Sequence, residues 1–95
     1  MSGAGPLVPP AGLTIAIPTY RRPGAVARAL RAVLAEAPDA DGPVEILVID
    51  NDPHGSAREA VAEAAGSAPG AAVRYVVEPA PGVSAVRNRA LAETA

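Results

Sequence analysis

The segment that most restricts the fold of this chain is an unbroken apolar run, ILVI at residues 46–49, inside the stretch VEILVID. A strand covered on one face alternates apolar and polar residues, whereas a strand covered on both faces reads as a continuous apolar run. Strands of the second kind are typical of parallel sheets, which have helices on both faces. We therefore expect a parallel sheet that includes residues 44–50.

Two further strands and three helices are predicted around this run. The β-branched stretches 13–18 and 72–77 predict strands, the first ended by Pro18, which has no N–H for a sheet ladder. A helix is predicted over residues 23–34, where one apolar stripe is formed by Val26, Leu30, Val33 and Leu34.

The second and third helices have weaker patterns. Residues 57–65 are mostly alanine, and Ser56 followed three residues later by Glu59 predicts a capping box at the start of that helix. A third helix is predicted from about Val83, with an apolar face formed by Val83, Val86, Ala90 and Leu91.

The alternation of strand and helix predicts the α/β class, as a three-layer βαβαβα unit whose parallel sheet has about three strands joined by right-handed crossovers. We expect residues 1–12, rich in proline and glycine, to be a disordered lead, and residues 13–95 to form this unit. Of the 95 residues, 23 are alanine, so little apolar area is available for a core. We expect the chain to be the front half of a larger domain.

Composition excludes several classes of protein. Cysteine is absent, so the chain has no disulfide and no thiolate metal site. A net charge of −2 gives no electrostatic reason to expect a nucleic acid or an acidic membrane as partner. No apolar run approaches the roughly 20 residues of a membrane-spanning helix, and the first residues do not resemble a secretory signal. We expect a cytoplasmic or cytoplasm-facing chain.

Open parallel sheets bind ligands beyond the carboxyl ends of their strands, which directs attention to residues 18–22, 50–54 and 78–82. The first of these contains neither a dinucleotide fingerprint nor a P-loop. It does contain Tyr20, whose ring either stacks on a nucleobase or covers the sheet edge. Both interpretations remain open at this level.

Asp50 ends the second predicted strand, and its carboxylate suits a ribose hydroxyl or a base N–H. Asn51 and Asp52 extend the same arc of polar groups, although Asn-Asp-Pro is also a common turn sequence. Arg87 lies where it could reach a phosphate, but exposed arginine is most often solvated. The lone His54 has no second histidine with which to form a metal pair.

Three segments together resemble a known family. IAIPTYRRP, EILVIDNDPHGS and YVVEPAPGVSAVRNRAL, in this order and spacing, look like the amino-terminal part of family 2 glycosyltransferases, which have the GT-A fold. The resemblance covers residues 13–91 and implies an incomplete GT-A, Rossmann-like half that binds a nucleotide-diphosphate sugar such as a UDP-sugar. The nucleotide-binding residues that it implies are Pro18, Thr19, Tyr20, Asp50, Asn51 and Arg87.

The sequence departs from the family pattern in two places and implies no catalytic residue and no metal ligand. Arg21 stands where the family usually has Asn, and Asn51 stands where it usually has a second Asp, which affects base preference. The family's Asp-x-Asp motif, which binds Mg²⁺ or Mn²⁺, follows a fourth strand. The segments 39–41 and 50–52 also read Asp-x-Asp, but they come too early in the sequence to be this motif. We therefore expect sugar transfer to an acceptor as the family activity, with this chain alone inactive.

Two alternatives fit the same pattern. A nonenzymatic binding or assembly module would have the open edge of its sheet completed by a partner chain. A flavodoxin-like or Rossmann-like domain of another function would be expected to have a phosphate loop, which the first strand-to-helix turn lacks.

Overall fold

The structure is a computed structural model that describes residues 13–36, 44–68 and 71–94. The predicted lead over residues 1–12 and the segment 39–41, which matches the letters of the Asp-x-Asp motif, lie outside the described residues. Within them the elements alternate as predicted, and their bounds are β1 Leu13–Thr19, α1 Pro23–Glu36, β2 Val44–Asp50, α2 Arg58–Gly66, β3 Ala72–Val77 and α3 Val83–Thr94.

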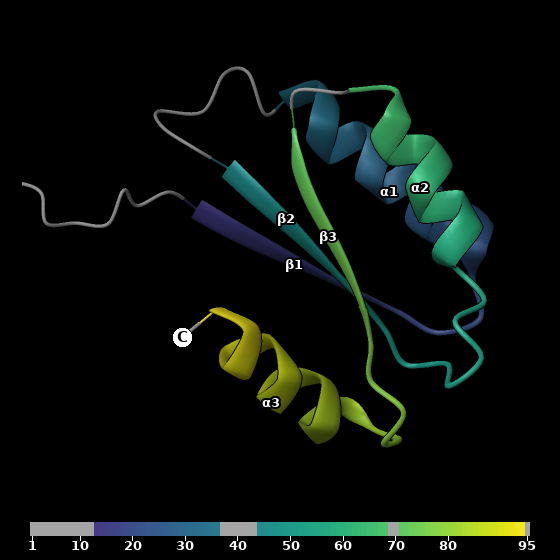
Figure 1. Cartoon of the computed structure of the whole chain (residues 1–95), viewed down its shortest axis with the longest axis vertical. Coiled ribbons are helices and arrows are strands. Elements are labelled where there is room, and N and C mark those ends of the chain that lie inside the picture. Colours follow the sequence, from purple (N-terminus) through teal and green to yellow (C-terminus); the bar gives the residue numbers. More distant parts are fainter. Residues whose placement is uncertain (1–12, 37–43, 69–70, 95) are drawn as a thin grey trace, which may run out of the picture.

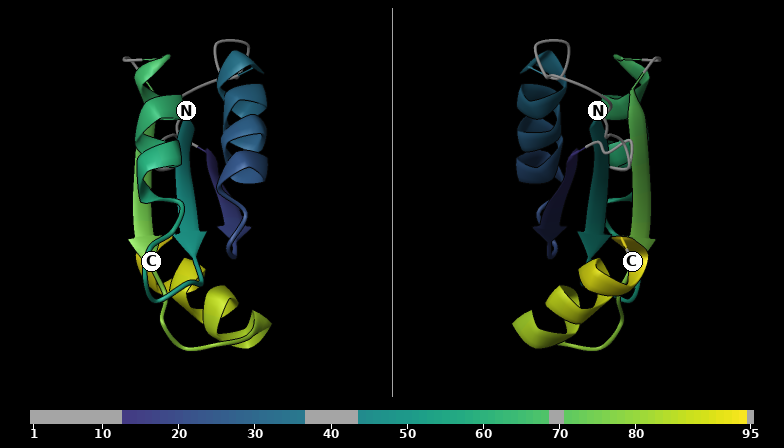
Figure 2. Two further views of the ribbon diagram at one scale, coloured as in Figure 1. Left: turned by 90° about the vertical axis from the view of Figure 1, so that its right-hand side faces the viewer. Right: turned by 90° about the vertical axis from the view of Figure 1, so that its left-hand side faces the viewer.

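The three strands form one parallel sheet in the order β1-β2-β3, which confirms the predicted α/β class. The helices α1 and α2 lie side by side on one face, while α3 lies on the other side towards the carboxyl ends of the strands (Figures 1 and 2). The central strand β2 is therefore covered on both faces. This arrangement explains why its four apolar residues 46–49 are all buried.

β1 extends one residue beyond its predicted end. Pro18 lies inside the strand, paired in register with Ile49, and the strand ends at Thr19. Proline is tolerated there because β1 is an edge strand, so the missing N–H costs no ladder bond on the outer side.

The main core lies between the sheet and the helices α1 and α2. The stripe predicted for α1 is confirmed, since Val26, Leu30 and Leu34 are buried and Val33 is half-buried. Burying an aliphatic side chain of this size contributes about 1.5–3 kcal/mol. The buried members of the core are Val26, Ala27, Leu30, Leu34, Ile46, Val48, Ala57, Val61 and Ala64.

The capping box predicted for the second helix is wrong. α2 begins at Arg58, and its N-cap residue is Ala57, which has no capping side chain. The N–H of Ala57 instead donates a hydrogen bond of 3.0 Å to Oδ2 of Asp50. The carboxylate at the end of β2 thus holds the residue that precedes the helix, and neither hydrogen bond of the predicted capping box is formed.

The third helix packs differently from the other two. It has no buried residue among those described, and Val83 and Leu91 of its predicted apolar face are 76% and 63% exposed. Polar side chains, described below, connect it to the sheet. None of the described helices is long and apolar enough to cross a membrane.

Candidate functional site

A cavity of about 770 Å³ opens at the carboxyl edge of the sheet, where the loops after the three strands meet. Its volume lies within the range of about 300–1,000 Å³ that is typical of small-molecule sites. Prolines and valines make the walls largely apolar. The lining residues are Pro18, Thr19, Tyr20, Arg21, Asn51, Pro53, Pro79, Pro81, Gly82, Val83 and Val86.

Tyr20 and Arg21 form the wall contributed by the loop after β1. The ring of Tyr20 is 51% exposed, and the guanidinium carbon of Arg21 lies over it, 5.0 Å from the ring centre. Arg21 has a φ of 53°, in the left-handed region that asparagine and glycine adopt most readily. For other residues this conformation costs about 1–2 kcal/mol, and strain of this kind clusters at functional sites.

Asp52 connects the loop after β2 to this wall. It is buried; its Oδ1 accepts a hydrogen bond of 3.0 Å from the N–H of His54, and its Oδ2 lies 3.7 Å from Nε of Arg21. The hydrogen bond from His54 lowers the pKa of the Asp52 carboxyl, and the Ser56 hydroxyl and the Arg21 charge lower it further. The carboxylate therefore stays ionised and holds Arg21 beside Tyr20.

Asp50 does not line the cavity. Its side chain is fully buried and accepts three hydrogen bonds, from the N–H of Asp52 at 3.0 Å, the N–H of Ala57 at 3.0 Å and the hydroxyl of Tyr75 at 2.5 Å. These donors satisfy a charge that would otherwise be costly to bury. In this structure Asp50 holds the loop after β2 by accepting hydrogen bonds from the N–H groups of Asp52 and Ala57.

Tyr75 and Gly55 are the partners in this arrangement that sequence reasoning missed. The guanidinium carbon of Arg58 lies over the ring of Tyr75, 5.0 Å from the ring centre. Gly55 has a φ of +66°, and a Cβ at this position would be 3.2 Å from the hydroxyl of Tyr75. Strand register could have indicated the contact between Tyr75 and Asp50. Asp50 pairs with Val77, and Tyr75 precedes Val77 by two residues, so the side chains of Tyr75 and Asp50 point to the same face of the sheet.

Asn51 connects the loop after β2 to the loop after β3. Its Nδ2 donates hydrogen bonds to the carbonyl oxygens of Glu78 at 2.7 Å and Ala80 at 2.8 Å, and its Oδ1 accepts one from the N–H of Gly82 at 3.3 Å. Aspartate could not donate the first two bonds. The amide therefore holds the segment that forms the third wall of the cavity.

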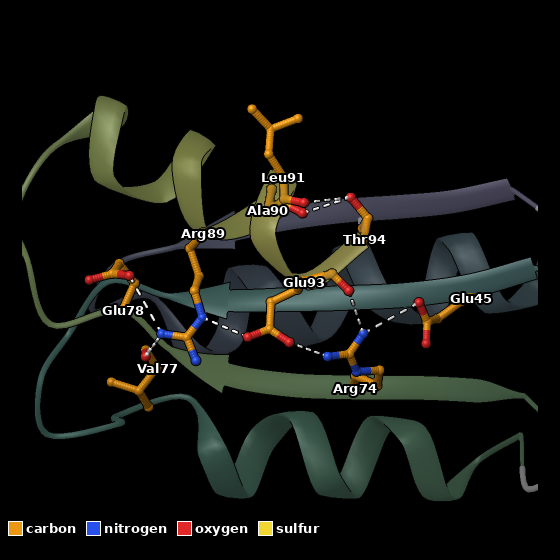
Figure 3. Close-up of polar contacts among 9 residues, drawn as sticks. All are labelled: Glu45, Arg74, Val77, Glu78, Arg89, Ala90, Leu91, Glu93 and Thr94. Atoms are coloured by element: carbon orange, nitrogen blue, oxygen red, sulfur yellow. Dashed lines mark hydrogen bonds and ion pairs between the residues drawn. The ribbon is translucent and has the colours of Figure 1, made fainter.

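Arginine and glutamate side chains hold α3, which continues this wall, against the sheet (Figure 3). Arg89 donates to the carboxylate of Glu93 at 2.8 Å and to the carbonyl oxygen of Val77 at 3.0 Å. Glu93 also pairs with Arg74 on β3, which in turn lies 3.7 Å from Glu45 on β2. The hydrogen bond from Arg89, together with its charge and that of Arg74, lowers the pKa of Glu93.

The structure brings together most of the predicted site residues. Pro18, Thr19, Tyr20 and Asn51 line the cavity, and the N–H of Asn51 donates to the carbonyl oxygen of Thr19 at 2.8 Å, across the strand ends. Asp50 lies behind Asn51. Arg87 is exposed on α3 and is not among the lining residues. Nucleotide binding by these residues stays a prediction.

The described residues do not fit a divalent-metal site. They contain no group of three or more histidine, aspartate or glutamate side chains placed to hold an ion. The carboxylates of the loop after β2 are already engaged, Asp50 by three donors and Asp52 by His54 and Arg21.

Comparison with solved structures supports the architecture of this sheet. The chain is similar to a mannosyltransferase, PcManGT from Pyrobaculum calidifontis, solved in complex with GDP-Man and Mn²⁺. The match has a TM-score of 0.62 and 25% sequence identity, and covers 88% of this chain and 25% of the mannosyltransferase chain. No curated protein sequence matches the chain.

An open α/β sheet with a cavity at its carboxyl edge defines a broad class of ligand-binding folds, here in a partial Rossmann-like GT-A form. The family model for glycosyl transferase family 2 matches residues 14–95, nearly all of the chain. The chain therefore belongs to glycosyl transferase family 2, which confirms the resemblance seen in the sequence. It spans about a quarter of the length of the mannosyltransferase that it resembles.

Proposed function

We propose that this chain binds the nucleoside part of a nucleotide-diphosphate sugar and thereby contributes to transfer of the sugar to an acceptor. Family membership supports glycosyl transfer as the reaction, and the neighbouring mannosyltransferase was solved with a nucleotide sugar. The observation that carries the proposal is the exposed ring of Tyr20 in the wall of a largely apolar cavity at the carboxyl edge of the sheet.

The cavity suits a flat base. Pro18, Pro53 and Pro81 offer rigid apolar surfaces, and Tyr20 offers an aromatic face. Base–aromatic stacking contributes about 1–3 kcal/mol per base. Asn51, held by the loop after β3, leaves the remaining lone pair of Oδ1 as an acceptor for a base or ribose donor.

The part proposed for these residues is binding and orientation. In the family a divalent metal, Mg²⁺ or Mn²⁺, would neutralise charge on the leaving diphosphate. The described carboxylates do not fit such an ion, so the role that we propose for this chain is limited to holding the nucleotide. A transfer assay with a nucleotide sugar and Mn²⁺ tests this limit, because turnover by the 95 residues alone would contradict it.

The binding proposal is tested by titration calorimetry of the 95-residue chain with UDP and GDP, with pyrophosphate as the control for unspecific anion binding. We expect nucleoside diphosphates to bind more tightly than pyrophosphate, and Tyr20→Ala to weaken them about tenfold because stacking is lost. Leu91→Ala, which removes an exposed apolar side chain of α3 outside the cavity, is the matched control. Equal affinity of the wild type and Tyr20→Ala for nucleotides would contradict the proposal.

A second candidate is an assembly module that is completed by another polypeptide. The specific observations in its favour are the outer edge of β3, unpaired within the described sheet, and the exposed Val83 and Leu91 on α3. Light scattering after size-exclusion chromatography separates the two candidates. A stable oligomer without nucleotide affinity would favour the module.

A further inference from the structure

Arg21 combines three features that structural packing alone does not require. Its backbone is left-handed, its guanidinium is held over the ring of Tyr20, and its side chain, 60% exposed, lines the cavity. An asparagine or glycine would adopt this backbone with less strain. The inference drawn from these features rests on the function proposed above.

The orientation of the guanidinium leaves one edge for a ligand. Nε lies on the side of Asp52, whose buried carboxylate is 3.7 Å away. The terminal nitrogens Nη1 and Nη2 form the opposite edge, and within the described residues neither has a hydrogen-bond acceptor. Because Asp52 is itself held by the N–H of His54, its charge favours an orientation in which Nε faces Asp52 and the Nη edge faces away from it.

The chemistry of that edge restricts the base. A guanidinium has donors only, and its planar fork pairs best with two adjacent acceptors. Guanine presents such a pair in N7 and O6, adenine presents the acceptor N7 beside an amino donor, and uracil has two acceptors, O4 and O2, that are separated by the N3–H donor. A base paired with the Nη edge would lie in the cavity that Arg21 and Tyr20 both line.

We propose that Arg21 is a specificity-determining residue that selects a guanine nucleotide by donating from Nη1 and Nη2 to O6 and N7, while Asp52 positions it. The observation that carries this inference is the set Asp52, Arg21 and Tyr20, joined by an ion pair and a cation–π contact at the cavity wall.

The test is titration calorimetry of the 95-residue chain with GDP, UDP and ADP. A good bidentate contact discriminates between bases by about tenfold or more, so we expect GDP to bind about tenfold more tightly than UDP or ADP. Arg21→Asn removes the guanidinium and suits the left-handed backbone. It should weaken GDP about tenfold more than it weakens UDP, so that the preference disappears.

Two controls make the result specific. Arg22→Asn removes the same charge from the adjacent exposed residue, which does not line the cavity, and should leave the GDP preference unchanged. On the ligand side, 7-deaza-GDP lacks the N7 acceptor and should bind the wild type about tenfold more weakly than GDP. Inosine diphosphate keeps N7 and O6 and should bind like GDP.

The outcomes separate this inference from the proposed function. Nucleotide binding that depends on Tyr20 but shows no guanine preference would overturn the inference alone. Equal weakening of GDP and UDP by Arg21→Asn would also overturn it, since Arg21 would then only attract the diphosphate. Absence of binding by every nucleoside diphosphate, with a melting transition that shows a folded chain, would overturn both.

Discussion

The hydroxyl of Tyr75 on β3 donates a hydrogen bond of 2.5 Å to Oδ2 of Asp50 on β2. The same carboxylate accepts from the N–H groups of Asp52 and Ala57, on the loop and at the start of the helix that follow β2. One buried acid therefore connects two strands, a loop and a helix start. The loop that carries Asn51 and Asp52 to the cavity depends on this connection.

Tyr75→Phe is expected to lower the free energy of unfolding by about 1.5–3 kcal/mol, because a hydrogen bond to a charged acceptor is lost. Burial raises the pKa of Tyr75, and the hydrogen bond to Asp50 raises it further. Its contribution to stability is then complete below the ordinary tyrosine pKa of 10.0 and is lost as pH rises above it. Urea unfolding between pH 7 and 11 checks this, and an equal alkaline loss in Tyr75→Phe would contradict it.

Gly55→Ala is expected to destabilise the chain by about 1–2 kcal/mol, because a side chain at φ +66° is strained. The added Cβ would also lie 3.2 Å from the hydroxyl of Tyr75 and 3.4 Å from Nη2 of Arg58. Gly66→Ala is the matched control: it lies at the end of α2 with open space around it and should be neutral or slightly stabilising. Similar melting temperatures for both variants would refute the argument.

Asn51→Asp is expected to destabilise the chain by about 1–3 kcal/mol, because two hydrogen bonds are lost and a carboxylate faces the carbonyl oxygens of Glu78 and Ala80. The loop after β3 should also loosen. The N–H of Gly82 donates a hydrogen bond to Asn51, so faster hydrogen exchange of this N–H in the variant would report the loosening of the loop. Unchanged exchange there and unchanged stability would show that the amide does not hold the loop.

Glu93→Gln is expected to loosen α3 from the sheet, because Glu93 connects Arg89 and Arg74. The hydrogen bond from Arg89 lowers the pKa of Glu93 below its ordinary 4.5, so its contribution is present above that pH and is lost as pH falls through the lowered value. Melting temperatures between pH 7 and 3 should therefore fall more steeply for the wild type than for the variant.

The matched control for this prediction is Glu63→Gln, in the exposed pair of Arg31 and Glu63 between α1 and α2. Exposed pairs contribute little, so this variant should change stability by less than about 1 kcal/mol at neutral pH. If both glutamine variants behave alike, the contacts around Glu93 do not hold α3.

The order of the elements could be predicted because it depends on local periodicity. The continuous run in β2 and the stripe of α1 reflect which neighbours cover them, and both patterns were confirmed. The capping box was not predicted correctly: Ser56 and Glu59 match the motif, but α2 begins at Arg58 after the N-cap residue Ala57, whose N–H donates to Asp50. A local motif cannot show that a strand end holds the start of the helix one residue further along.

The amino-acid sequence alone determined that polar loops meet at the carboxyl edge of a parallel sheet, since alternating strands and helices place all strand ends on one side. Only the tertiary structure decided which side chains face the cavity. Asp50 and Asn51 are adjacent in sequence, yet the first points to the buried face, where Tyr75 and the N–H of Ala57 satisfy its charge, and the second lines the cavity. That division depends on strand register and on donors from other elements, which no local pattern encodes.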